Sequence, residues 1–352
     1  MSITKVKNVI SDSFSNKIYV LIFIGNIIIL QSHCFPLDVI DTSNNWYKLI
    51  SLLGQLTIPV MSYFFFTSGF LFFYNFDLNK TKYKLFSRFF SLVIPFLIWN
   101  LFAIVFVRLW DYIEFGIIDF SFVKLYELFI IHGEYGPLND PLWYLFRLIT
   151  YIYLAPFIYL GVKNKTIGFL FIIACVILNL LFKTNYLSFS YWLPMFMLGS
   201  WISIHYFKYI NKTIPNFFLN TIVAKVLAII VFIGLNWYIL KVNSQQDNDI
   251  ILYLYRLLSG IYIYFLLKFI NFKPPSAMVK KLSFYIFVSQ FLFLKVAKSV
   301  VSKLIDVNER GFYQFVAFIM IFILKSVMIF LSYLMIKTLS PKVLKILTGY
   351  RA

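Results

Sequence analysis

The chain has 352 residues, of which 61% are hydrophobic and only 13% are charged, and its formal net charge is +18. A soluble domain carries about 25% charged residues, so this composition excludes an ordinary soluble protein and predicts a helical integral membrane protein. The basic residues are scattered over short segments rather than gathered in one patch, which argues against nucleic-acid binding.

Ten apolar runs follow one another along the chain, and each is about long enough to cross a bilayer, since a spanning helix needs roughly 20 residues. The predicted spans are 18–35, 55–74, 89–107, 143–162, 166–182, 191–207, 224–240, 250–270, 282–301 and 314–336. We therefore expect an all-α, polytopic membrane protein in which residues 1–352 form a single membrane domain. The first run does not end in small residues typical of a cleavage site, so we expect it to remain in the mature chain.

The distribution of Lys and Arg predicts the orientation. If the N-terminus is cytoplasmic and the ten spans alternate, 20 of the 32 basic residues lie in cytoplasmic segments or at the adjoining span ends, and 8 lie in outer segments or at the adjoining span ends. The positive-inside rule counts these residues, so both termini are predicted to be cytoplasmic. The longest connection is the outer segment 108–142, and near-helical spacing over 120–131 predicts an interfacial helix within it.

Polar residues inside the spans are the candidate functional residues. In the first span Tyr19, Asn26 and His33 are seven residues apart, and this spacing places them on one helix face. An imidazole titrates near neutral pH and can accept a proton from a hydroxyl. His33 is therefore either a general base or a packing histidine.

Four basic residues also lie in the interior of spans, away from the terminal turns. Lys325 lies eleven residues from each end of the tenth span, where an ammonium needs a partner or a hydrated cavity. Arg147, Arg256 and Lys295 lie in the predicted outer halves of their spans, where their side chains can extend to the lipid headgroups. No span has an Asp or Glu in its interior, which argues against a carboxylate-based ion relay. No metal-binding motif is present in the sequence, so we expect no metal cofactor.

Several segments together resemble one family. The first span carries a late histidine, His33, and the segment 58–71 reads IPVMSYFFFTSGFL, similar to a "VP…FFxxSGFLL" pattern. Four further segments read RFFSLVIPFLIW (88–99), PLWYLFRLITYIYLAP (141–156), FMLG (196–199) and SFYIF (283–287). In this order they resemble the integral-membrane acyltransferase 3 family, bacterial O-acyltransferases that modify cell-surface glycans.

The resemblance implies a function. An acyl group, expected to be acetyl, would pass from cytoplasmic acyl-CoA (acetyl-CoA) to a hydroxyl of a cell-envelope polysaccharide or its lipid-linked precursor, at the bacterial inner membrane. It implies that His33 is the catalytic base and that the basic loop with Arg88 and Lys84 binds the phosphates of the donor. The expected partners are the lipid bilayer and the glycan acceptor.

Further candidates for a substrate-binding or structural role are Asn26, Ser68, Trp143, Arg147, Gln290 and Lys325. The chain departs from the family at four positions: Ile22 stands where the family usually has Arg, Ser91 where the partner of Arg88 is usually Arg, Phe146 where an Arg commonly follows the Trp, and Gln290 where a His often follows SFxIY. These departures leave open a member with altered or lost activity. The alternative from another class is a transporter or flippase for a lipid-linked glycan.

Overall fold

The computed structural model describes residues 12–35, 45–116, 137–184, 187–207, 250–266, 274–305 and 311–350, together with Ile230 and Gly234. These residues form helices and their connections, and no strand occurs among them. Within the described ranges, five helical stretches are long and apolar enough to cross a membrane, and a bent helix pair is a sixth candidate. The all-helical fold class is thus confirmed, whereas the number of ten spans and the cytoplasmic termini remain predictions.

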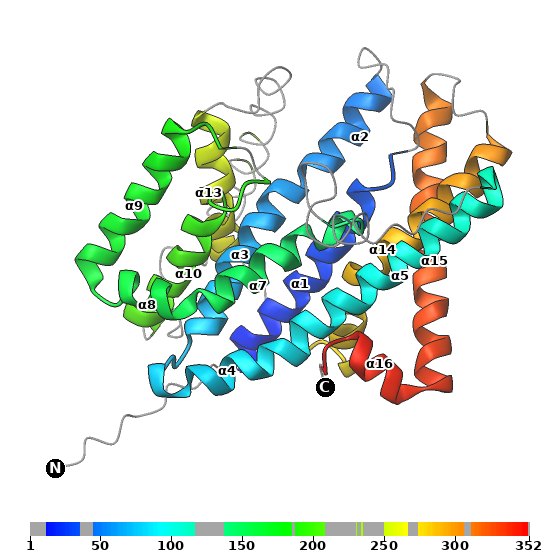
Figure 1. Ribbon diagram of the computed structural model, residues 1–352. Coiled ribbons are helices and arrows are strands. Elements are labelled where there is room, and N and C mark those ends of the chain that lie inside the picture. Colours follow the sequence, from blue (N-terminus) through cyan, green and yellow to red (C-terminus); the bar gives the residue numbers. More distant parts are fainter. Residues whose placement is uncertain are drawn as a thin grey trace. The chain divides into compact units, whose positions relative to one another are not determined.

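The helices follow one another in the order shown in Figure 1. They are α1 (Asp12–Ser32), α2 (Asn45–Gln55), α3 (Thr57–Phe73), η1 (Leu78–Lys80), α4 (Thr81–Arg88), η2 (Phe89–Val93), α5 (Ile94–Phe115), η3 (Asp140–Leu142), α7 (Trp143–Tyr153), α8 (Ala155–Val162), α9 (Lys165–Leu181), α10 (Leu193–His205), α13 (Ile250–Leu266), α14 (Ala277–Leu304), α15 (Phe312–Leu339) and α16 (Pro341–Leu347). The predicted interfacial helix 120–131 lies outside the described residues, as does the predicted span 224–240 apart from Ile230 and Gly234.

The third predicted span is longer than expected. Its helix α5 continues to Phe115, eight residues beyond the predicted end at 107, and closes at Gly116 with a left-handed φ of 69°. Asp111 therefore lies on the helix and not in a loop, and its Oδ1 is 3.5 Å from the Nζ of Lys295 on α14. Both side chains are partly exposed, so this ion pair contributes at most about 1 kcal/mol.

The fourth predicted span, 143–162, is not one straight helix. It consists of α7 and α8, which are bent by 66° at a break. Pro156 is at the start of α8 and has no N–H to donate to a carbonyl one turn earlier, which is the ordinary cause of such a break.

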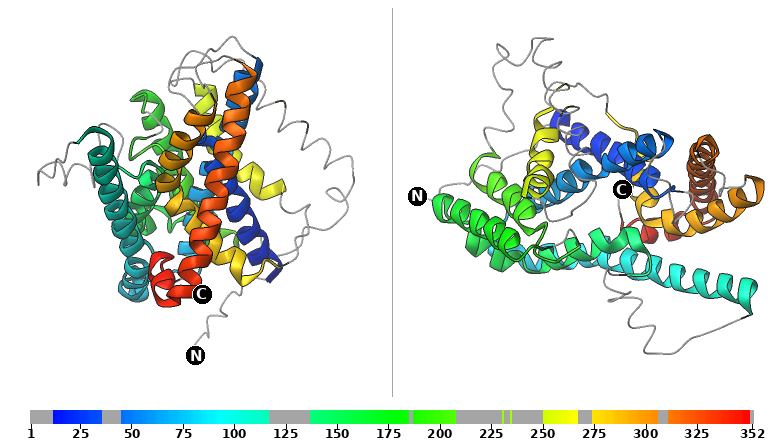
Figure 2. Two further views of the ribbon diagram at one scale, coloured as in Figure 1. Left: turned by 90° about the vertical axis from the view of Figure 1, so that its right-hand side faces the viewer. Right: turned by 90° about the horizontal axis from the view of Figure 1, so that it is seen from above.

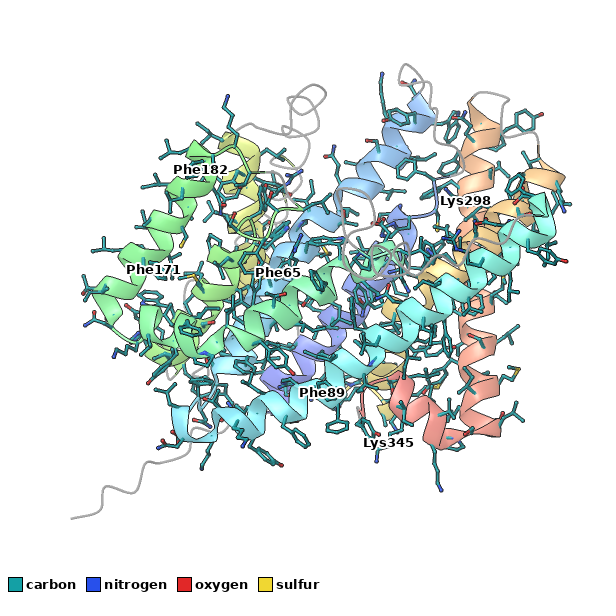
Figure 3. The ribbon with its side chains drawn as sticks, in the orientation of Figure 1. Phe65, Phe89, Phe171, Phe182, Lys298 and Lys345 are labelled. Atoms are coloured by element: carbon teal, nitrogen blue, oxygen red, sulfur yellow. The ribbon has the colours of Figure 1, made fainter. Side chains whose placement is uncertain are left out.

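The chain folds into two compact units. Unit 1 contains Met1–Ile22, Ile58–Lys84 and Thr150–Pro275, and unit 2 contains Phe23–Thr57, Leu85–Ile149 and Ser276–Ala352. In unit 1, helix α10 packs against α8, α9 and α13. Phe182 ends α9 with 75% of its surface exposed, and Figure 3 shows it extending away from the helix, as expected for a lipid-facing side chain.

Unit 2 is built on the long helices α14 and α15. They pack against each other, α5 packs against α14, and α2 packs against α15 (Figure 2). The short helix α16 is tied to α5, because the indole Nε1 of Trp99 donates a 3.1 Å hydrogen bond to the carbonyl oxygen of Leu347. This unit positions the candidate site.

Candidate active site

His33 follows directly on helix α1, which ends at Ser32. The backbone here is closed by a turn, in which the N–H of Cys34 donates to the carbonyl oxygen of Gln31 at 3.0 Å. Cys34 is fully buried, whereas His33 is partly exposed. The imidazole is therefore held at a helix end with a fixed backbone.

Lys325 on α15 lies beside the same end of α1. Its side chain is fully buried, and its Nζ donates a 3.1 Å hydrogen bond to the carbonyl oxygen of Leu30. This carbonyl belongs to the last turn of α1, whose backbone oxygens lack helical partners, and a cation there also complements the helix dipole. The partner that Lys325 was expected to need is thus a backbone carbonyl, one turn before His33.

Burial and, to a lesser extent, nearby positive charges determine the protonation state of His33. The pKa of His33 is lowered by burial and further by the positive charges of Lys325 and of Lys298 on α14, which Figure 3 labels. Burial raises the pKa of the Cys34 thiol, which donates a hydrogen bond to the Leu30 carbonyl oxygen at 3.1 Å. At neutral pH the imidazole is therefore neutral and able to accept a proton, and the thiol is protonated and not a nucleophile.

Asn26 connects α1 to α14. Its Nδ2 donates 2.9 Å hydrogen bonds to both the carbonyl oxygen and the Oγ of Ser283, and its side chain is buried. Tyr19, expected on the same polar stripe, is 41% exposed. The residues of the predicted stripe therefore differ in burial: Asn26 is buried and links two helices, whereas Tyr19 is exposed.

Four buried amide side chains of unit 2 share one arrangement. Each donates its NH₂ group to a main-chain carbonyl, while its own oxygen has no donor within the described part of the chain: Asn26, Asn100, Asn139 and Gln290. For Asn139 the acceptor is Val288, at 3.3 Å, and for Gln290 it is Phe287, at 3.2 Å. These carbonyl partners determine which end of each amide is oxygen. The free oxygens can accept hydrogen bonds from hydroxyl or amide groups of a substrate, or from water.

Lys84 and Arg88 are one turn apart on α4. The Nζ of Lys84 donates to the carbonyl oxygens of Phe72 and Tyr74, each at 3.1 Å, and so closes the end of α3. Arg88 is partly exposed and is the last residue before η2, a π-helical turn, and such turns are frequent at functional sites. Donor binding by these two residues stays a prediction.

Ser68 lies beside a close helix contact in unit 1. A Cβ on Gly69 would be 2.0 Å from the carbonyl oxygen of Phe196 on α10, and a Cβ on Gly199 would be 2.0 Å from that of Phe66 on α3. Two of the segments that carry the family resemblance therefore meet through their glycines. This is the close packing that small residues permit in membranes, and it is the structural role we assign to Gly69, while the role of Ser68 stays a prediction.

Arg147 and Trp143 are both partly buried on α7, and the guanidinium of Arg147 lies 5.5 Å from the ring centroid of Phe146. Arg256 in unit 1 is buried, and its Nη1 donates to the hydroxyl of Tyr191 at 3.0 Å. The extension to the headgroups that was considered for Arg256 is therefore not observed.

The structure thus divides the sequence candidates between its units. Unit 1 contains Ser68 and Lys84, and unit 2 contains His33, Asn26, Arg88, Trp143, Arg147, Gln290 and Lys325. Sequence reasoning missed Asn100, Asn139 and Lys298. Asn100 could have been found as a polar residue inside an apolar run, whereas nothing in the sequence connects Asn139 with α14 or Lys298 with His33. Across the ranges that the structure describes, no group of three or more His, Cys, Asp or Glu residues could hold a metal ion.

Comparisons with known proteins bear on the chemistry of this site. A family model described as an acyltransferase domain (Acyl_transf_3) matches residues 21–337, nearly the whole chain. No curated protein and no solved structure matches the chain. The matched range includes His33, Arg88 and Lys325 and segments of both units. Together with the long apolar helices, this match shows that the chain belongs to the acyltransferase 3 family and is a multi-pass membrane acyltransferase for groups other than aminoacyl groups.

Proposed function

We propose that this acyltransferase moves an acetyl group from cytoplasmic acetyl-CoA to a hydroxyl of a cell-envelope polysaccharide, or of its lipid-linked precursor, in the bacterial inner membrane. The observation that carries this proposal is His33, a neutral imidazole held at the end of α1 beside a buried ammonium, within a chain of this family. On the predicted topology this end of α1 faces the outside, where an envelope glycan arrives.

In the proposed reaction His33 is the general base. A ring nitrogen accepts the proton of the acceptor hydroxyl while the hydroxyl oxygen attacks the carbonyl carbon of the thioester. When the carbon–sulfur bond breaks, the coenzyme A thiolate takes the proton from the imidazolium, so that the products are an ester and a thiol. His33 is thus restored to its neutral form at the end of each cycle.

The donor would enter from the cytoplasmic face. Arg88 lies on the basic segment 80–88, predicted to be cytoplasmic, and a guanidinium can bind phosphate oxygens with two parallel hydrogen bonds. The unpaired amide oxygens of unit 2, such as those of Asn139 and Gln290, are acceptors for the hydroxyl or amide donors of a substrate. These features support a donor that is phosphorylated at one end and polar along its length.

Inverted membrane vesicles test the proposal, because their cytoplasmic face is exposed to added donor. Vesicles from cells that make the protein should transfer label from acetyl-labelled acetyl-CoA to the endogenous envelope glycan, and His33→Gln vesicles should not. Sealed right-side-out vesicles should show little transfer until they are permeabilised. Absence of labelled glycan with the wild-type protein in inverted vesicles would contradict the proposed donor or acceptor.

A further inference from the structure

The ammonium of Lys325 is an unusual feature of unit 2. It has three N–H donors, and in the described part of the chain one of them is used, by the Leu30 carbonyl oxygen at 3.1 Å. Ile321, one turn before Lys325 on the same helix, belongs to a buried apolar cluster with Cys34, Ala297 and Phe318. Burying a charge is energetically costly unless it is paired, and one neutral carbonyl compensates for only part of that cost.

The position of the Lys325 ammonium determines which nearby groups its charge can stabilise. Leu30 is one turn before His33 on the same helix end, and the charge of Lys325 acts on the imidazole. A fixed positive charge in a water-poor site is the arrangement that stabilises an anion formed during a reaction, since no solvent has to reorganise around it.

Building on the proposed function, we propose that Lys325 is a second catalytic group, whose ammonium donates a hydrogen bond to the oxyanion that forms on the thioester carbonyl. As the hydroxyl oxygen bonds to the carbonyl carbon, the π electron pair moves to the carbonyl oxygen and the hydroxyl proton moves to His33. The oxyanion then re-forms the double bond, the carbon–sulfur bond breaks, and the thiolate receives the proton from His33. Lys325 keeps its proton throughout, and its positive charge stabilises the negative charge of the intermediate.

A purely structural role for Lys325 makes different predictions. As a cap of α1, it would stabilise the fold by binding the Leu30 carbonyl, and its loss would reduce the amount of folded protein without changing the rate per folded molecule. As an oxyanion group, it affects kcat much more than the KM for acetyl-CoA. Removing its charge should also raise the pKa of His33, because a neighbouring cation disfavours the imidazolium; the charge of Lys298 continues to act on the ring.

The test uses the full-length protein in inverted vesicles, with acetyl-labelled acetyl-CoA and the endogenous glycan. Lys325→Met and Lys325→Gln should lower kcat about 100-fold per folded molecule at the pH optimum, with a KM within threefold of wild type, and the acid limb of the pH–rate profile should move to higher pH. Lys325→Arg, which keeps the charge, should recover at least a tenth of the rate. The control is Lys337→Gln, an exposed lysine on the same helix, which should resemble wild type.

Each outcome has a defined meaning. A neutral variant with kcat within threefold of wild type and an unmoved acid limb would overturn the role of Lys325 while leaving the proposed function intact. If Lys325→Met does not accumulate, Lys325→Gln decides the question, since its amide keeps a polar group at the site. A wild-type protein that transfers no label at all contradicts the proposed function itself, not the assignment of Lys325.

Discussion

At the scale of single residues, His33 and Lys325 show what the sequence could and could not predict. Both stood out because a titratable side chain in an apolar run requires a reason. Their proximity could not be predicted, because the link runs through the backbone carbonyl of Leu30, and a main-chain acceptor has no sequence signature. The same holds for Asn139, whose contact with Val288 depends on the packing of η3 on α14.

The proposed base makes a direct prediction. His33→Ala and His33→Gln should each lower acyl transfer about 100-fold or more, because neither side chain can take the hydroxyl proton. Both proteins should insert and accumulate normally, as judged by immunoblots of membranes. The control is His205→Gln: the Nε2 of His205 lies 2.9 Å from the Val162 carbonyl oxygen, which is a structural contact that Gln can also make. Near-normal transfer by His33→Gln would show that the base lies elsewhere.

The pH dependence follows from the same residue. Since the pKa of His33 is lowered in the folded protein, the imidazole stays neutral at pH 7, and activity should fall only when the pH drops through this lowered pKa. We therefore expect kcat/KM to be flat through neutral pH, with an acid limb below the ordinary histidine range. An acid limb centred at pH 7 or above would mean that another group controls the rate.

Arg88 is predicted to bind the donor. Arg88→Ala should raise the KM for acetyl-CoA about tenfold, which corresponds to about 1.4 kcal/mol, and the effect should shrink at high salt because the site is solvated. Titrations of initial rate against acetyl-CoA at low and high ionic strength measure this. The matched control is Lys337→Ala, which removes a basic charge from an exposed position on α15. An unchanged KM at low salt would exclude Arg88 from the donor site.

At the scale of the helices, apolar runs predicted where helices form but not how they end or bend. The helix α5 extends beyond its apolar run because Asp111 and Glu114 lie on its exposed surface and do not interrupt it. The break between α7 and α8 was not expected, although Pro156 was visible, because a proline in a membrane helix is often tolerated when neighbours satisfy the freed carbonyls. The pairing of α3 with α10 could not be predicted from the sequence, because Gly69 and Gly199, which form the contact, are 130 positions apart.

The contact between α3 and α10 predicts a stability effect. Gly199→Ala places a methyl group 2.0 Å from the Phe66 carbonyl oxygen, so the helices must separate, and we expect a loss of about 2 kcal/mol. Thermal unfolding of the detergent-solubilised protein measures it. Gly54→Ala is the control, because its methyl group would lie 3.4 Å from the Phe35 ring and alanine is the better helix former. Equal melting temperatures for Gly199→Ala and wild type would contradict the close approach of the two helices.

At the scale of the whole molecule, the topology is the prediction with the widest consequences. New cysteines at Lys82 and Lys281 should react with a membrane-impermeant maleimide only from the cytoplasmic side, and one at Asp119 only from outside. The unsubstituted protein is the background control, since Cys34 is buried and Cys175 lies within α9. Labelling of Lys82→Cys from outside would show that the orientation is the opposite of the predicted one, and the face from which each substrate arrives would then be exchanged as well.

The central claim is that this membrane acyltransferase places acetyl esters on an envelope glycan through His33. The most direct measurement is NMR of the purified glycan from cells that lack the gene, complemented with the wild-type gene or with His33→Gln. The account predicts O-acetyl signals with the wild-type gene and their absence both without the gene and with His33→Gln at equal protein levels. Identical O-acetyl signals in all three samples would contradict it.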